Sequence, residues 1–228
     1  MMERELGILM LDTQFPRIPG DVGNEASFSF PVRKKIVTGA NPRRVVMQGD
    51  SALLSPFINA AIELEHEGVS AITTSCGFLA VFQKELANAV SVPVFTSSLL
   101  QANLIYPLLK TNQIIGILTA NAKTLGARHF AGVSIEHIPK VVYGMENSDF
   151  AKVFVGNRTS LDKELAQREM VAVALRMVAD YPEIGAVILE CTNMPPYARA
   201  VQQAIDRPVY DIITLCEYMM SGIKRGSY

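Results

Sequence analysis

The chain has 228 residues, of which 49% are hydrophobic and 19% charged, so it is long and apolar enough to bury a substantial core. Its formal net charge is −1 and its lysines and arginines are scattered, which argues against a surface for nucleic acid or for an anionic membrane. The early apolar run LGILML is too short to cross a bilayer and lacks the pattern of a secretory leader. We therefore expect a cytoplasmic protein that binds a small molecule.

Apolar runs of strand length alternate with longer stretches of helical periodicity, which predicts an α/β fold with mostly parallel sheets. In chain order, the expected strands are 6–12, 44–49, 69–75, 92–95, 113–119, 134–139, 185–190 and 207–212. The expected helices are 53–66, 78–90, 98–110, 160–180, 195–205 and 213–224.

Two local features accompany these elements. The segment Thr159-x-x-Asp162 has the form of a capping box and predicts the start of the helix 160–180. The stretch 13–32 is long and rich in proline and glycine, which indicates a loop. This loop is expected either to cover a binding site and exclude water or to be a passive surface excursion.

The sequence contains an internal duplication. SAITTSCGF…KELANAVSVPVF and GAVILECTNM…ARAVQQAIDRPVY show the same order of strand, helix and strand. The matched pairs, each 115 residues apart, are Cys76 with Cys191, Ala89 with Ala204, and Pro93 with Pro208. We expect two similar α/β halves, residues 1–100 and 101–212, with the segment 213–228 packing back on the first half.

The duplicated cysteines, Cys76 and Cys191, each follow an expected strand and precede an expected helix. Ligands bind beyond the carboxyl ends of strands in open α/β sheets, so we expect the two thiols to face one cleft between the halves. One thiol could then remove a proton from a carbon acid while the other delivers a proton to the opposite face. Helix N-termini lower thiol pKa values and bind carboxylates. The small polar residues beside the cysteines are Ser75, Gly77, Thr192 and Asn193.

The remaining cysteine and the histidines indicate no further site. Three cysteines without a CxxC motif argue against a disulfide framework, and Cys216 is expected in the core of the last helix. His66, His129 and His137 are widely spaced, so we expect no metal site.

The sequence resembles the aspartate/glutamate racemase superfamily, which includes the hydantoin racemases, in the segments GILMLDT, TTSCGF, IGILTANAKTL and LECTNMP. The resemblance implies a racemase without a cofactor, with two pseudosymmetric domains, an active site in the interdomain cleft and a homodimeric assembly. It implies that Cys76 and Cys191 are the acid/base pair and that Thr192 belongs to the Cys-Thr pair of the amino-acid racemases. By the same resemblance, the pocket would also be lined by Asp12, Thr13, Thr119 and Thr124.

The sequence departs from that family pattern at two places. Gly77-Phe78 stands where amino-acid racemases of this type usually have Asn-Thr, and Asn193 stands where they often have His or Glu. Phe78 is expected to make the pocket more apolar than a glutamate site.

These observations favour a racemase or epimerase of an amino acid or related α-substituted carboxylate, such as aspartate, glutamate or a hydantoin. A maleate-type cis-trans isomerase or a decarboxylase of the same superfamily is the first alternative. A non-catalytic two-lobed protein that binds a small ligand is the second.

Overall fold

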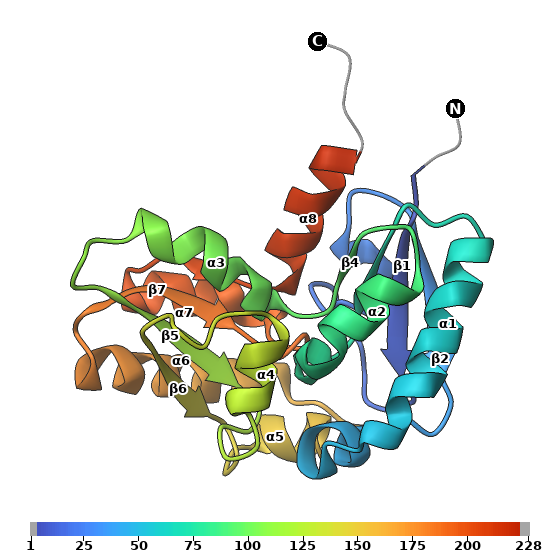
Figure 1. The fold of residues 1–228 in the computed structure, drawn as a ribbon. Helices are drawn as coiled ribbons and strands as arrows, with labels where there is room; N and C mark the ends of the chain where they lie inside the picture. Colours follow the sequence, from blue (N-terminus) through green and yellow to red (C-terminus); the bar gives the residue numbers. More distant parts are fainter. Residues whose placement is uncertain (1–3, 224–228) are drawn as a thin grey trace.

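The computed structural model describes residues 4–223 and has two lobes, each built on a four-stranded parallel sheet (Figure 1). The first sheet has the order β2-β1-β3-β4. Its strands are β1 Leu6–Leu11, β2 Val32–Val37, β3 Ala71–Thr74 and β4 Val94–Phe95. The second sheet repeats this order as β6-β5-β7-β8. Its strands are β5 Ile114–Thr119, β6 Lys140–Gly144, β7 Ile184–Leu189 and β8 Val209–Tyr210.

The repeated strand order confirms a pseudosymmetric α/β fold with parallel sheets. The edge strands β4 and β8 are 115 residues apart, as are the two duplicated cysteines. Every residue of β1 and β7 is buried, which is typical of parallel strands that helices cover on both faces.

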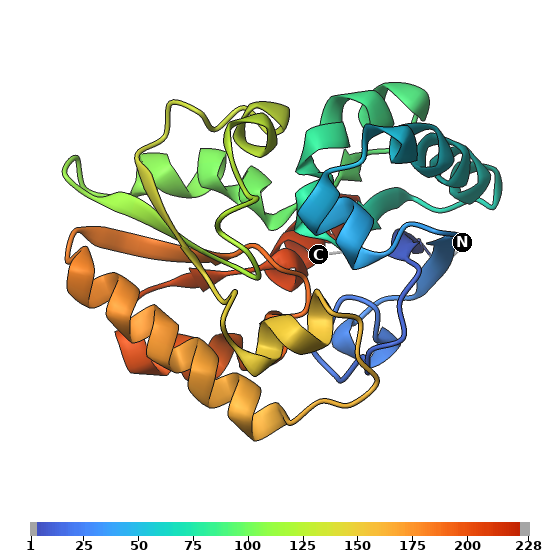
Figure 2. The same ribbon diagram turned by 90° about the horizontal axis from the view of Figure 1, so that it is seen from below.

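Helices cover the two sheets, and α6 runs along the outer side of the second lobe (Figure 2). The α-helices are α1 Leu54–His66, α2 Gln83–Ala89, α3 Ala102–Ile105, α4 Ala127–Gly132, α5 Asp149–Phe154, α6 Lys163–Asp180, α7 Ala198–Ile205 and α8 Ile212–Ile223. The shorter helical elements are η1 Glu25–Ser27, the π-helix η2 Arg43–Gln48, η3 Ser51–Leu53, η4 Gly77–Phe82, η5 Ser98–Gln101, η6 Tyr106–Leu108 and η7 Pro195–Tyr197. Within residues 4–223, no helix combines the length and the apolar character needed to span a bilayer.

The last helix packs on the first sheet, as the sequence predicts for the segment 213–228. Leu215 and Met220 of α8 share a buried cluster with Leu6 and Ile8 of β1. Cys216 is fully buried in the same cluster, which confirms its place in the core. Residues 1–3 and 224–228, which the expected halves and last segment include, lie outside the described residues.

The two lobes pack closely against each other. Leu9 and Ile72 of the first sheet belong to the same buried cluster as Ile117 of the second. At Gly132 of α4, an added Cβ would lie closer than 3.0 Å to the backbone of Ala80 in η4, so the two helices are in direct backbone contact. This contact fixes the lobes around the carboxyl ends of β3 and β7.

Several expected elements are wrong. The expected strand 44–49 is the π-helix η2, which follows Pro42 and ends at Gly49 with a φ of 53°. The expected strand 134–139 is irregular, and the strand of this region is β6, immediately after it. Helix α6 begins at Lys163, and its N-cap is the side chain of Asp162, not that of Thr159.

Candidate active site

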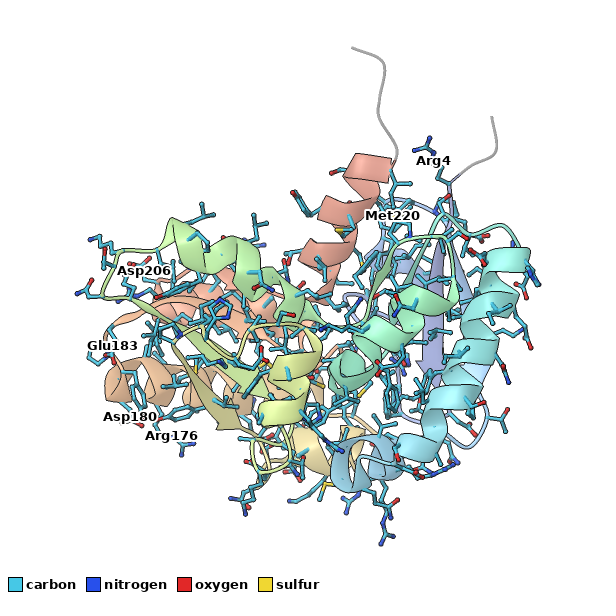
Figure 3. All side chains as sticks on the ribbon, in the orientation of Figure 1. Arg4, Arg176, Asp180, Glu183, Asp206 and Met220 are labelled. Atoms are coloured by element: carbon cyan, nitrogen blue, oxygen red, sulfur yellow. The ribbon has the colours of Figure 1, made fainter. Side chains whose placement is uncertain are left out.

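The two duplicated cysteines line one cavity between the lobes. Cys76 follows β3 and directly precedes η4, and Cys191 follows β7. The cavity is partly open, and about 370 Å³ of space not occupied by atoms lies inside it and at its mouth. Charged side chains on the outer edge of the second lobe, such as Arg176, Asp180 and Glu183, point away from this junction (Figure 3).

Buried hydrogen bonds join the two strand ends that carry the cysteines. The Ser75 hydroxyl accepts a hydrogen bond from the Leu11 N–H at 2.8 Å. The Thr192 hydroxyl donates to the Ser75 carbonyl at 2.6 Å and so ties the second lobe to the first. The Cys191 thiol lies 3.5 Å from the Asn193 amide oxygen, to which it donates. Thus the hydrogen bond from Thr192 to Ser75 joins the two strand ends, while the other two hydrogen bonds hold residues within one lobe.

The walls of the cavity are largely apolar and aromatic. Phe15 and Phe154 contact each other edge to face, with ring centroids 4.9 Å apart. The apolar lining residues are Leu11, Phe15, Pro42, Val46, Phe78, Ala120, Phe154 and Val155. Among the described residues that line the cavity there is no lysine or arginine, and Glu190 is the single acidic one.

The loop between β1 and β2 covers the cavity and reaches the second lobe. Arg17 and Asp21 form an ion pair at 2.8 Å, and Asp21 also accepts a 2.6 Å hydrogen bond from the Asn193 side chain. Gly20 has a φ of 97° and leaves no room for a Cβ against Pro196. Because this loop also contributes Phe15, the structure favours the covering loop over a passive excursion.

Both cavity thiols are neutral at pH 7. Burial, followed by the nearby Glu190, raises the pKa of the Cys76 thiol to about 12, although the Phe78 N–H lowers it. Burial and Glu190 also raise the pKa of Cys191 well above its usual value, and a charge on Cys76 raises it further. The expected lowering of the thiol pKa at a helix start is therefore outweighed by burial. The pair resists carrying two negative charges at once.

Glu190 is a site residue that the sequence analysis missed. Its side chain is fully buried, and its Oε2 accepts a 2.6 Å hydrogen bond from the Thr119 hydroxyl. Its Oε1 has no hydrogen-bond partner among residues 4–223 and lies against Gly77. Burial raises the pKa of this carboxyl to about 7, although the Thr119 hydroxyl lowers it.

The structure brings most of the expected site residues together. The expected residues that line the cavity are Ser75, Cys76, Gly77, Phe78, Cys191, Thr192 and Asn193. Thr119 lies behind this lining and reaches the site through Glu190.

Three expected residues lie outside the lining. Asp12 is exposed and accepts a hydrogen bond from the Gly39 N–H at 3.1 Å. The hydroxyl of Thr13 accepts one from Arg17 at 3.1 Å, within the covering loop. The hydroxyl of Thr124 is buried and has no partner among the described residues.

Comparison with known proteins gives a family and a fold. The family model described as Asp/Glu/Hydantoin racemase matches residues 41–216. A dimethylsulfoniopropionate lyase of Durusdinium sp. clade D is 32% identical over 224 residues, which cover 95% of this chain and 74% of that protein. Dimethylsulfoniopropionate lyase 6 of Emiliania huxleyi is 32% identical over 230 residues, but the chain spans only 59% of its length.

Solved structures with low sequence identity share the fold. Unliganded arylmalonate decarboxylase has a TM-score of 0.64 at 14% identity, covering 99% of this chain and 94% of that one. An aspartate racemase homologue from Pyrococcus horikoshii OT3 has a TM-score of 0.60 at 15% identity, covering 97% and 99%.

Proposed function

Since the chain belongs to the Asp/Glu/hydantoin racemase family and is an enzyme, we propose that Cys76 and Cys191 act on a carbon next to a carboxylate. The observation that carries this proposal is that thiols from both lobes line one cavity. Family membership also argues against the expectation of a non-catalytic binding protein.

The reaction that we propose is the cleavage of dimethylsulfoniopropionate to dimethyl sulfide and acrylate. A thiolate takes the proton on the carbon next to the carboxylate, and the C–H electrons form the new carbon–carbon double bond. The bond from the β-carbon to sulfur breaks, and its electrons leave with neutral dimethyl sulfide. Acrylate and one proton complete the balance. The names of the relatives support this substrate.

The cavity fits this substrate better than it fits aspartate or glutamate. A second carboxylate would need a cationic partner, and Arg17, whose charge reaches Cys76, is already paired with Asp21. A dimethylsulfonium group carries no hydrogen-bond donors and is suited to aromatic walls such as Phe15, Phe78 and Phe154. The backbone N–H groups at the start of η4 would stabilise the enolate-like charge that develops on the substrate carboxylate.

The two thiols would hold different protonation states during the reaction. Because a charge on Cys76 raises the pKa of Cys191, the pair favours one thiolate and one neutral thiol. A bound sulfonium lowers the pKa of a nearby thiol, so the base forms in the substrate complex. The remaining thiol can donate a hydrogen bond to the substrate carboxylate.

Dimethyl sulfide release from dimethylsulfoniopropionate, measured by gas chromatography, tests the proposal. Cys76→Ser and Cys191→Ser are made singly, and loss of the general base should lower kcat/KM by roughly 10²–10⁴-fold. Cys216→Ala changes a thiol outside the cavity lining and should keep the wild-type rate. Absence of dimethyl sulfide from the folded wild type, or full activity in both serine variants, would contradict the proposal.

A racemase or epimerase is the second candidate, because an elimination needs one base whereas inversion uses two. The cavity has two thiols, one from each lobe. In deuterated water, such an enzyme should place deuterium next to the carboxylate in both enantiomers of aspartate, glutamate or a hydantoin. Each single serine variant should abolish racemisation. This outcome without dimethyl sulfide release would favour the racemase.

We also propose a homodimer in the cytoplasm, as the sequence analysis expects. Exposed apolar side chains such as Leu104, Leu108 and Tyr218 offer surface for a second copy. Light scattering coupled to gel filtration tests the dimer, and a monomeric mass at micromolar concentration would exclude it.

A further inference from the structure

Glu190 is a buried carboxyl group in the cavity wall, and one of its oxygens has no hydrogen-bond partner among the described residues. Its side chain has 0% exposure, and Thr119 occupies only Oε2. No described residue donates a hydrogen bond to Oε1. A carboxylate buried without a partner is costly, so its presence here indicates that a ligand completes the site.

The carboxyl group lies close to both reactive positions. Glu190 directly precedes Cys191 in the chain, and its Oε1 lies against Gly77, the neighbour of Cys76. Its charge raises the pKa values of both thiols. A substrate whose reacting carbon lies between the sulfurs therefore has its other groups within reach of this oxygen.

We propose that Glu190 is the counter-ion that selects a methylated onium group, either sulfonium or quaternary ammonium, on a short carboxylate. This inference rests on the proposed function and extends it to the basis of substrate choice. Oε1 supplies one negative charge, and Phe78 and Phe154 are aromatic residues of the same cavity lining. A primary ammonium has three hydrogen-bond donors, and the apolar part of the wall offers no acceptors for those that Oε1 does not take, so methylation favours binding.

If Glu190 is the counter-ion, the affinity for a cation depends on pH. The carboxylate form of Glu190 binds the cation, and burial places its pKa at about 7, so affinity rises with pH through about 7 and then levels off. In the protein without ligand, the thiols Cys76 and Cys191 are neutral throughout this range because their pKa values are raised. Arg17 and Asp21 are paired with each other.

His129 is a further titratable group near this wall. Its ring contacts Phe78, with centroids 4.9 Å apart. Burial lowers its pKa to about 4, so it stays neutral where Glu190 titrates.

Two ligands of nearly equal shape, neither of which reacts, measure the effect of the cationic charge on binding. 3-(Trimethylammonio)propionate carries the cation, and 4,4-dimethylpentanoate replaces its nitrogen by carbon. Isothermal titration calorimetry should show that the wild type prefers the cation by about tenfold or more at pH 8. Cation affinity should be about tenfold weaker at pH 6 than at pH 8, and affinity for the neutral ligand should change far less.

Glu190→Gln keeps the size and the Thr119 hydrogen bond but removes the charge. It should abolish both the cation preference and its pH dependence, and it should raise KM for dimethylsulfoniopropionate more than it lowers kcat. Glu146→Gln, which removes a charge outside the cavity lining, should keep the preference. The wild-type titration tests the inference even if Glu190→Gln does not fold.

Equal wild-type affinity for the two ligands at pH 8, or a preserved preference in Glu190→Gln, would overturn the inference. A cation preference that depends on Glu190 without dimethyl sulfide release supports the counter-ion and refutes the lyase. Dimethyl sulfide release without that preference supports the lyase and refutes the counter-ion.

Discussion

Gly77 leaves no room for a methyl group, so Gly77→Ala should destabilise the protein and disturb the cavity. An added Cβ would lie closer than 3.0 Å to both Oε1 and the backbone carbonyl oxygen of Glu190. The carboxyl group could rotate, but the carbonyl is held because the Glu190 N–H donates to Leu118 at 2.8 Å and Ser98 donates to the adjacent Leu189 carbonyl at 2.8 Å. Overpacking against a fixed backbone costs about 1–3 kcal/mol, and this site should fall in the upper part of that range.

Thermal unfolding followed by circular dichroism measures this cost. A loss of about 2–3 kcal/mol in a chain of this size lowers Tm by about 4–12 °C. Gly222→Ala is the matched control, because a Cβ at this position in α8 meets nothing within 4 Å. It should leave stability unchanged or raise it by up to about 1 kcal/mol. A Gly77→Ala protein within about 0.5 kcal/mol of the wild type would refute the contact between Gly77 and Glu190.

Two further substitutions test the surroundings of the cavity. Thr119→Val removes the hydrogen bond that lowers the pKa of Glu190. The pH at which cation affinity is half-maximal should therefore move above about 7. An unchanged midpoint in calorimetry would exclude this role of Thr119. Asp21→Ala removes the ion-pair partner of Arg17 and the acceptor for the Asn193 side chain, and it should cost about 3–5 kcal/mol. Limited proteolysis should then cut the covering loop faster, and an unchanged rate would contradict its anchoring.

The sequence predicts the sheets and the thiols for one reason, which is that both repeat. Cys76 and Cys191 recur at a constant separation, and each follows an apolar run that forms a buried strand. By contrast, Val45 and Val46 have the composition of a strand, yet they lie in the π-helix η2 between Pro42 and Gly49. There the strand propensity is overridden, and Val45 and Val46 lie in the buried cluster that includes residues of both lobes.

The residues that the sequence could not place are those that reach the cavity through tertiary structure. Phe15 lies in a loop whose path depends on the pairing of Asp21 with Asn193, which is 172 residues away along the chain. Asp12 and Thr13 follow β1 directly, as the resemblance to the racemase family implies for pocket residues, but the chain turns their side chains toward Gly39 and the loop itself. The end of a strand thus indicates the region of a site and not the direction of each side chain.

The duplication contains a signal for Glu190, because position 190 corresponds to position 75 in the first half at the same separation of 115 residues. The equivalent residue, Ser75, is neutral and accepts a hydrogen bond from the backbone of Leu11, whereas Glu190 accepts one from the side chain of Thr119. Two similar thiols suit a proton transfer that runs in both directions. A charge on only one side makes the two faces of the cavity unequal, which suits a substrate with a cation at one end and a carboxylate at the other. The difference between Glu190 and Ser75 therefore favours an elimination, whereas the two equivalent thiols alone would suit a racemisation.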